Sequence, residues 1–382
     1  MTYIPRILAA SLRQQLARFS VVGVTGPRQS GKSTLLQHTL GNKYRYVTFD
    51  DYKMIDLLHH DPDRFLRMYD DRVVFDEVQK VPELFPAIKL AVDADRKRRG
   101  KFVLTGSSQF SFIKGITESL AGRIGLISLL PFEFREIPHL LRTPSVFRGC
   151  YPEVVSERFR RSTDWYSSYL ETYVNRDVRH LSAIGNLRDF RRCLQMLAAR
   201  TGQILSLSEL ARDVGVSVPT IRQWISILEA SYILFLLAPY YRNLGKRLVK
   251  SPKVFFYDTG LVSFLTGVDS QRTFQQGPMH GPIFENYVIA EIKKHLSHTN
   301  ANAELFYFRT SHGVEVDLII DRRRSLDLIE VKSSESFRPA MLQNISILKR
   351  KTDRAFLVYQ GKSLPSADSI AIQNYSEFLE SL

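Results

Sequence analysis

The sequence has few cysteines, no long apolar run and no acidic excess, and each shortage narrows the class of protein. Its two cysteines, Cys150 and Cys193, cannot form a disulfide framework, which favours a reducing compartment and predicts a cytoplasmic protein. The N-terminal residues lack the apolar core of a secretion signal. The most apolar run, 232–238, is far shorter than the roughly 20 residues that cross a bilayer. We therefore expect no membrane span.

What the chain does contain is ordinary globular composition with a strong basic excess. Apolar residues make up 44% of its 382 residues and charged residues 24%, which excludes disordered, collagen-like and coiled-coil proteins. This length predicts two or three domains. The net charge of +14 indicates a polyanionic partner, either nucleic acid or an anionic membrane surface. The excess is greatest in 142–250, with 17 Lys and Arg against 9 Asp and Glu, although these arginines would equally suit solvated helix faces.

Three regions with different patterns follow one another along the chain. In 1–140, apolar strands alternate with helices such as 32–40 and 83–98, which predicts a parallel sheet covered on both faces. The strands are expected at 19–25, 44–49, 73–76, 102–105 and 124–129. Region 141–250 is predicted to be mainly helical, with helices at 164–180, 190–200, 208–214 and 218–228.

The third region, 251–382, is predicted to be a mixed α/β domain. A helix is expected at 284–296. Strands are expected at 254–257, 305–309, 314–320, 326–331, 355–359 and 370–373. The sequence contains no internal repeat and no low-complexity segment.

A phosphate-binding loop is the strongest motif. The stretch GPRQSGKS matches G-x-x-x-x-G-K-[ST] between a predicted strand and a predicted helix, which is the context that this motif requires. Backbone N–H groups of such a loop form an anion-binding nest, and the helix N-terminus adds partial positive charge. Lys32 is expected on the β- and γ-phosphates and Ser33 on Mg²⁺. The full set of predicted nucleotide contacts is Gly26, Pro27, Arg28, Gln29, Ser30, Gly31, Lys32, Ser33 and Thr34.

Carboxylates at the end of the strand 73–76 are predicted to complete this site. Asp76 is expected beside Mg²⁺, and Glu77 is expected to polarise the attacking water as a general base. Thr105, or a serine just after it, is a candidate for sensing the γ-phosphate at the carboxyl end of its strand. A plain polar turn is the alternative there. Arg123 is a candidate γ-phosphate contact, in its own chain or in a neighbouring copy.

The order of these motifs resembles a known family. The stretches GPRQSGKSTLL, YVTFDD, VVFDEVQKVPELF, VLTGSSQF and LAGRIGLISLLPFEF resemble the bacterial and archaeal AAA-type ATPases that carry a C-terminal DUF4143 domain. Similarity continues through YLETYVNRDVRHL, VFFYDTGL, GPIFENYVIAEI, EVDLII and IEVKSS, so it covers nearly the whole chain. The resemblance implies an ATP-binding protein and leaves its biological role open.

A helix-turn-helix pattern lies in the middle region. A short helix at 208–214 is followed by Gly215 and by a second helix with Ser217 as its N-cap. In a DNA-reading version, Ser217, Thr220, Arg222 and Gln223 would face the major groove. A wing is expected near 240–250, with Arg242, Lys246, Arg247 and Lys250. Equally, such a module can serve only to pack domains together.

Acidic residues near the C-terminus form a nuclease-like pattern. Glu330 and Lys332 fall on one face of a predicted strand, and Asp317 lies on the preceding strand, where it can meet them. With Glu285 as a helix acid, the pattern resembles the PD-(D/E)xK nuclease core. Asp317 and Glu330 would bind Mg²⁺, and Lys332 would orient or activate water. The alternative is an amphipathic hairpin with its charges outward.

Three further residues are peripheral candidates for a second acid or for phosphate contacts: Glu315, Arg309 and His312. Together the patterns predict an α/β fold in three domains, 1–140, 141–250 and 251–382, that uses ATP and Mg²⁺ and engages nucleic acid, with DNA favoured. A homo-oligomer is a candidate assembly. The alternatives are a nucleotide switch with a non-catalytic C-terminal scaffold and, with less support, an ATPase at a membrane surface.

Overall fold

The structure is a computed structural model, and it describes residues 3–106, 115–116, 119–173, 186–240 and 250–382. The chain divides into two compact units. Unit 1 comprises residues 1–132 and 297–300, and unit 2 comprises 133–296 and 301–382. Among the described helices, none is long and apolar enough to cross a membrane.

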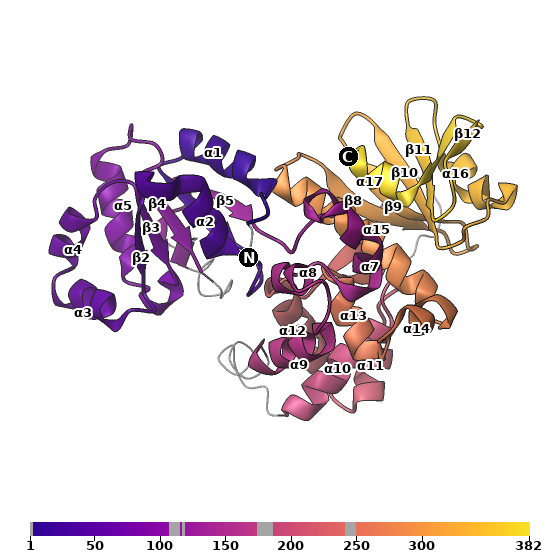
Figure 1. The fold of residues 1–382 in the computed structure, drawn as a ribbon, viewed down its shortest axis with the longest axis horizontal. Coiled ribbons are helices and arrows are strands. Elements are labelled where there is room, and N and C mark those ends of the chain that lie inside the picture. The colour runs from indigo at the N-terminus through magenta and orange to yellow at the C-terminus, as the bar shows by residue number, and fades with distance from the viewer. Residues whose placement is uncertain (1–2, 107–114, 117–118, 174–185, 241–249) are drawn as a thin grey trace. The chain divides into compact units, whose positions relative to one another are not determined.

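Unit 1 contains a parallel sheet of five described strands, in the order β2-β3-β4-β1-β5 (Figure 1). This confirms the expected parallel α/β architecture. Its elements are α1 (Leu8–Arg18), β1 (Val21–Thr25), α2 (Lys32–Leu40), β2 (Arg45–Thr48), α3 (Tyr52–His60), α4 (Pro62–Met68), β3 (Val73–Asp76), α5 (Leu84–Ala94), β4 (Phe102–Thr105) and β5 (Ile124–Ser128).

Both faces of this sheet are covered by helices, because successive side chains of a strand point to opposite sides. On one face, Val22 and Val24 pack with apolar residues of α1 and α2. On the other face, Val21 packs with apolar residues of α3, α4 and α5. Strands buried on both sides explain the nearly continuous apolar runs of the sequence.

Unit 2 combines a group of helices with a mixed sheet. The helices are α7 (His139–Arg148), α8 (Pro152–Ser156), α9 (Ser162–Tyr173), α10 (Leu187–Ala199), α11 (Leu207–Val214), α12 (Val218–Ala230), α13 (Thr259–Thr266), α14 (Gln271–Gln276), α15 (His280–His298), α16 (Gln343–Leu348) and α17 (Tyr375–Glu380). The strands are β6 (Leu234–Pro239), β7 (Lys253–Phe256), β8 (Glu304–Arg309), β9 (Glu315–Asp321), β10 (Leu326–Lys332), β11 (Arg354–Tyr359), β12 (Leu364–Ala367) and β13 (Ile370–Asn374).

The described strands of unit 2 form one sheet in the order β12-β13-β11-β10-β9-β8-β6-β7. Strand β6, from the region expected to be mainly helical, pairs parallel with β8 and antiparallel with β7. Its apolar run 232–238 is therefore explained by burial in this sheet. Of the helix expected at 164–180, residues 174–180 lie outside the described residues.

Candidate functional site

The phosphate loop connects β1 to α2, as the motif predicts. Gly26 has φ +134°, and a Cβ there would lie 2.1 Å from the carbonyl oxygen of Leu129. Gly31 has φ +91° and precedes the first residue of α2. Both glycines are needed because side chains rarely tolerate these backbone angles, and at Gly26 the neighbouring backbone also leaves no room. The loop is thus shaped for close approach of its backbone to an anion.

Lys32 lies at the start of α2 with its side chain folded over the loop. Its Nζ donates hydrogen bonds to the carbonyl oxygens of Gly26, at 3.0 Å, and Pro27, at 2.8 Å. The residue is buried. The ammonium group is therefore held above the nest that the loop forms.

Asp76, at the end of β3, meets the N-terminal turn of α2. Its Oδ2 accepts a hydrogen bond from Ser33 Oγ at 3.0 Å and another from the Tyr46 hydroxyl, and its Oδ1 accepts from the Glu77 N–H at 3.0 Å. Burial raises the pKa of Asp76, whereas the hydrogen bonds from Tyr46 and Ser33 lower it. The predicted pair of Ser33 and Asp76 is brought together. The part played by Tyr46, on β2, carried no signal in the sequence.

Glu77 follows in the left-handed conformation, with φ +58°. Its carboxylate accepts a hydrogen bond from the Gln79 side-chain amide. Thr105 ends β4 and is fully buried, and its Oγ1 has no hydrogen-bond partner among the described residues. The serines at 107 and 108, predicted as alternatives to Thr105, lie outside those residues.

Arg123 lies at the end of this sheet where the strands begin, opposite the end that carries the phosphate loop. It precedes β5, whose first residue pairs with Val21 at the start of β1, whereas the phosphate loop follows the end of β1. The five residues of β1 span roughly 17 Å, which separates Arg123 from the end of β1 where the phosphate loop begins. The Arg123 guanidinium is bound to Asp93 through Nε and Nη2, both at 2.9 Å. Within one chain, Arg123 is therefore too far from the phosphate loop to contact a γ-phosphate there.

Arg6 supports the phosphate loop through hydrogen bonds to backbone carbonyl oxygens, a role that the sequence did not indicate. Its Nη1 donates to the carbonyl oxygen of Ser30 at 2.8 Å, and its Nη2 donates to that of Leu130 at 2.7 Å. The guanidinium lies 4.7 Å from the centroid of the Phe132 ring. Since Arg6 is 20 residues before the motif, no local spacing connects it to the loop.

The nuclease-like residues lie together in unit 2. Strands β9 and β10 are antiparallel neighbours, with Leu318 opposite Ile329. Lys332 Nζ lies 2.6 Å from Glu330 Oε1 and 3.5 Å from Asp317 Oδ2. Asp317 Oδ2 also accepts a hydrogen bond from the backbone N–H of Val331 at 2.9 Å. The two strand acids and the lysine therefore form one cluster rather than an outward-facing hairpin.

Glu285 joins this cluster from α15, together with Lys253, which the sequence analysis did not select. Lys253, on β7, is 3% exposed, and its Nζ lies 3.4 Å from Glu285 Oε1 and 2.5 Å from Glu315 Oε1. Of the peripheral candidates, Arg309 pairs with Glu315 at 3.1 Å. His312 is exposed in the turn between β8 and β9.

Burial and mutual repulsion raise the pKa values of two acids in this cluster. Burial first, and then the Asp317 carboxylate, raise the pKa of Glu285 to about 7 and that of Glu330 to about 8. The carboxylates in turn raise the pKa values of Lys253 and Lys332, against the effect of burial. No three His, Cys, Asp or Glu side chains of the described chain stand in an arrangement ready for a metal ion. Glu330 Oε2, however, is buried without a hydrogen-bond partner there.

The helix-turn-helix pattern corresponds to α11 and α12. Ser206 caps α11 by accepting a hydrogen bond from the Glu209 N–H. Gly215 is left-handed, with φ +86°, and Ser217 caps α12 as expected. The side chains proposed to read DNA are exposed or partly exposed on α12 and its cap. Most of the predicted wing, 241–249, lies outside the described residues.

Comparison with protein-family models divides the chain into three matches. Residues 18–138 match the AAA domain family, 143–272 match a domain of unknown function (DUF8612), and 280–378 match another (DUF4143). With the phosphate loop and the parallel sheet of unit 1, these matches define a P-loop ATPase of the AAA class.

Curated relatives extend over almost the whole chain. An uncharacterized protein of Mycobacterium tuberculosis is 30% identical over 96% of this chain and 82% of its own length, as is its counterpart in Mycobacterium bovis. An uncharacterized protein of Methanocaldococcus jannaschii is 22% identical over 78% of this chain and 71% of its own. The chain belongs to the family of AAA-domain ATPases with a DUF4143 domain.

Among solved structures, the Walker-type ATPase of Pyrococcus abyssi matches with a TM-score of 0.47 and 15% identity. The match covers 68% of this chain and 94% of that one.

Proposed function

We propose that this protein hydrolyses ATP with Mg²⁺ and that its nucleotide state controls how a nuclease-like C-terminal domain engages nucleic acid. The observation that carries the ATPase part is the 3.0 Å contact between Ser33 Oγ and Asp76 Oδ2 beside the buried ammonium of Lys32. These are the groups that P-loop enzymes use for Mg²⁺ and for the β- and γ-phosphates.

The residues around the phosphate loop suit both ATP and Mg²⁺. The glycine nest has no room for a Cβ at Gly26, and Thr105 presents a buried hydroxyl without a partner among the described residues. Ser33 and Asp76 would bind the metal, which supplies charge neutralisation when bound. Lys32 would exchange its two loop carbonyls for phosphate oxygens. Glu77 would accept the proton of the attacking water.

For the C-terminal cluster we propose a PD-(D/E)xK-like fold and Mg²⁺-dependent phosphodiester cleavage. Glu330 Oε2 has no hydrogen-bond partner among the described residues, so it is an acceptor that a cation would satisfy. Burial and then the neighbouring Asp317 carboxylate raise the pKa of Glu330. Glu285 would complete the acids from α15. Lys332, 2.6 Å from Glu330, would orient the attacking water.

The second candidate function is a nucleotide switch with a non-catalytic C-terminal scaffold that binds DNA or protein. Lys253 favours it, because this buried ammonium already neutralises Glu285 and Glu315. A cluster whose acids are paired with lysines has less need of a metal ion. In either case we place DNA contact on α11, α12 and the basic middle region, and a homo-oligomer would let Arg123 approach the nucleotide of a neighbouring copy.

One assay separates these functions. ATP hydrolysis and plasmid cleavage are measured with Mg²⁺ in the wild type, in Lys32→Ala and in Asp317→Asn. The nuclease proposal expects cleavage to disappear in Asp317→Asn while ATP turnover persists, and expects cleavage to change with ATP. ATP turnover in the wild type and in Asp317→Asn, with no cleavage by any of the three proteins, supports the scaffold. Turnover that survives Lys32→Ala would contradict the ATPase assignment itself.

A further inference from the structure

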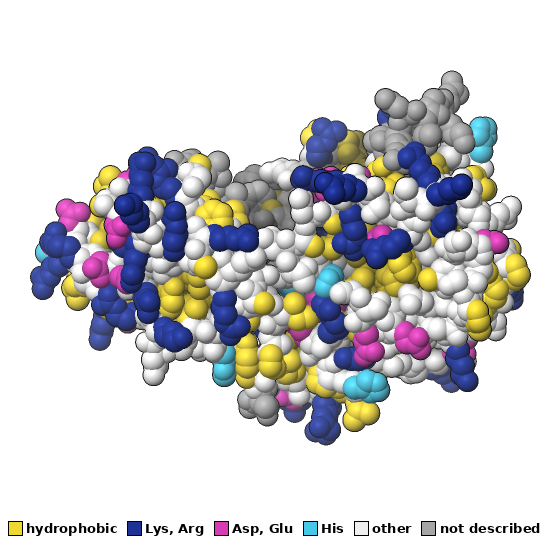
Figure 2. Space-filling model, turned by 90° about the horizontal axis from the view of Figure 1, so that it is seen from above, with side chains coloured by type: hydrophobic (Ala, Val, Ile, Leu, Met, Phe, Trp, Pro, Cys, Tyr) yellow, Lys and Arg dark blue, Asp and Glu magenta, His cyan; other side chains and the backbone are white. Residues whose placement is uncertain are grey.

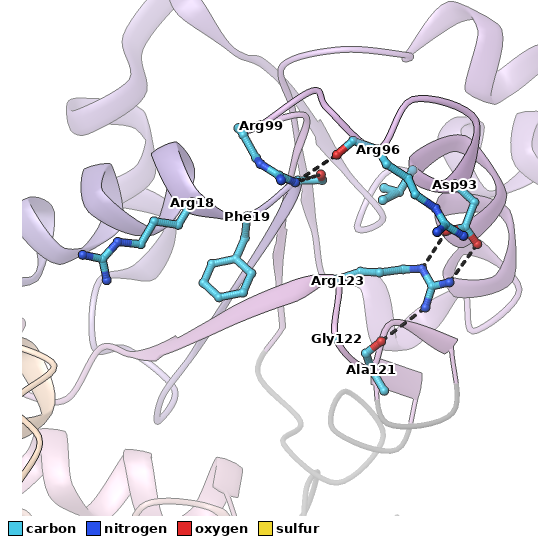
Figure 3. A pocket seen from close by; sticks show the side chains of 10 residues that line it. Arg18, Phe19, Asp93, Arg96, Arg99, Ala121, Gly122 and Arg123 are labelled. Atoms are coloured by element: carbon cyan, nitrogen blue, oxygen red, sulfur yellow. Dashed lines mark hydrogen bonds and ion pairs between the residues drawn. The ribbon is translucent and has the colours of Figure 1, made fainter.

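A hollow of about 490 Å³ opens in unit 1 at the end of the sheet where the strands begin (Figure 3). The phosphate loop lies at the opposite end of the strands. Phe19 precedes β1 and Arg123 precedes β5, so both lie at this edge. Figure 3 shows the Phe19 ring on one side of the hollow, the Arg123–Asp93 pair on the other and Arg99 between them. All residues that line it belong to unit 1.

The lining is strongly basic, with four arginines, Arg18, Arg96, Arg99 and Arg123, against a single acid, Asp93. Asp93 is already bound by Arg123 at 2.9 Å and by Arg96 at 3.3 Å. Arg18 and Arg99 have no acidic partner in the described part of the chain. The hollow therefore keeps uncompensated positive charge. The visible face of unit 1, at the left of Figure 2, likewise has many Lys and Arg side chains.

Arg99 is held in place although no acid among the described residues binds it. Its Nη1 donates to Ser20 Oγ at 3.2 Å and to the carbonyl oxygen of Arg96 at 3.0 Å. These neutral acceptors orient the guanidinium and leave its charge unneutralised. Arg18 extends from the last turn of α1 and is exposed. The oriented guanidinium of Arg99 and the exposed guanidinium of Arg18 together suit successive phosphates of an extended nucleic-acid strand.

Phe19 supplies an aromatic surface beside these cations. Its ring is half-buried, and a Cβ on Gly125 would lie 2.6 Å from a ring carbon, so the ring packs against the backbone at the start of β5. The glycine thus allows the ring to lie where it does. An aromatic side chain fixed on one side and accessible on another is a platform on which a base can stack.

We propose that this hollow binds single-stranded nucleic acid, with a base stacked on Phe19 and backbone phosphates bound by Arg18 and Arg99. An aromatic platform together with free guanidinium groups is the combination that recognises single strands without reading their sequence. Duplex fits poorly, because its bases are already stacked. The site is separate from the phosphate loop and from the C-terminal acids, so it does not rest on the ATPase or nuclease proposals.

The test is fluorescence anisotropy of a labelled 15-nucleotide oligo-dT with the full chain, in EDTA, over a range of salt concentrations. Arg18→Gln/Arg99→Gln is compared with Arg13→Gln/Lys97→Gln, which removes two charges from α1 and from the loop after α5 without touching the lining. Thermal unfolding of each variant checks that unit 1 stays folded. We expect the Arg18/Arg99 pair to reduce the slope of log K against log salt by about 1.4, at about 0.7 per lost phosphate contact.

Phe19→Leu keeps an apolar side chain against Gly125 but removes the stacking surface. We expect it to weaken binding roughly 5- to 150-fold with an unchanged salt slope. Unlabelled duplex should compete poorly with the oligo. The proposal is overturned if the wild type does not bind, if the lining pair and the control pair lose affinity equally, or if duplex competes as well as single strand. A loss confined to Arg222→Gln/Lys250→Gln would overturn it in favour of the middle region, leaving the proposed function intact.

Discussion

The hydroxyl oxygen of Ser33 lies 3.0 Å from Oδ2 of Asp76, although the two residues are 43 positions apart. Ser33 is in the first turn of α2, which follows β1, and Asp76 ends β3. Strand β4 lies between β1 and β3 in the sheet. The pair therefore exists because parallel strands end at the same edge, where α2 also begins.

Replacing Ser33 with alanine should raise the Mg²⁺ concentration needed for half-maximal ATP hydrolysis. The hydroxyl is one of two protein oxygens that we place on the metal, so we expect the rate at limiting Mg²⁺ to fall by about 100-fold. A Mg²⁺ titration at fixed ATP measures the effect. Thr39→Ala, the same loss of a hydroxyl farther along α2, is the control. An unchanged Mg²⁺ dependence in Ser33→Ala would remove Ser33 from the metal site.

Arg6→Met should loosen the phosphate loop without touching the nucleotide. The substitution leaves the buried carbonyls of Ser30 and Leu130 without their donor, which costs about 1–3 kcal/mol for each unsatisfied group. We expect a lower unfolding midpoint and a KM for ATP that rises about tenfold, more than kcat falls. Steady-state kinetics check this, with the exposed Arg13→Met as control. A wild-type KM in a destabilised Arg6→Met would limit Arg6 to a purely structural role.

Lys253→Gln should reveal whether the C-terminal acids can hold a divalent cation. Four carboxylates and two lysines meet there, and the variant removes one ammonium while keeping a polar side chain. We expect Mn²⁺ affinity, measured by calorimetry without nucleotide, to increase about tenfold, equivalent to about 1.4 kcal/mol. Lys362→Gln, an exposed lysine of the same unit, should leave it unchanged. If Lys253→Gln binds Mn²⁺ no better than the wild type, Lys253 does not compete with a cation.

A buried ion pair away from both sites predicts a pH dependence of stability. Lys294 Nζ lies 2.5 Å from Glu291 Oε1 on α15, and burial raises the pKa of Glu291 to about 6 despite this partner. A raised carboxyl pKa means that the folded state binds more protons than the unfolded state between about pH 4.5 and 6. The group's contribution to stability is therefore present at low pH and lost as the pH rises through that window.

Lys294→Met removes the positive charge that pairs with Glu291, so the pKa of Glu291 should rise further. The loss of stability with rising pH should then continue to higher pH. We expect the variant to be destabilised by about 3–5 kcal/mol at pH 8 and by less at pH 5. Denaturant unfolding at several pH values measures this. Glu291→Gln/Lys294→Met should recover most of the loss at pH 8. A destabilisation independent of pH would mean that packing of the lysine stem, rather than its charge, is what matters.

Much of unit 1 was predictable because its signals are local. The glycines of the phosphate loop, the apolar strands and Asp76 at a strand end each follow from neighbouring residues, and the five strands form at the expected positions. Arg6 and Tyr46 were not predictable. Both act through contacts with residues more than 20 positions away, and neither belongs to a pattern.

In unit 2 the sequence indicated the acids but not the lysine that meets them. Glu285, Asp317, Glu330 and Lys332 were selected from strand alternation and from a resemblance to nucleases, and the fold brings them together. Lys253 looked like an ordinary basic residue before a short strand. The sequence also did not reveal that the run 232–238 contributes β6 to the C-terminal sheet, because an apolar run does not determine which strands it will pair with.

The sequence by itself determined the ATPase fold, the phosphate loop and the family, because short-range periodicity and motif spacing encode them. Only the tertiary structure decided which charges meet. It places Arg123 against Asp93 far from the phosphate loop and pairs Lys253 with Glu285 and Glu315. Within the residues that the structure describes, it also leaves Arg18 and Arg99 beside Phe19 without an acidic partner. Electrostatic partnership depends on distances of a few ångströms between residues that are remote in the chain, and composition does not contain those distances.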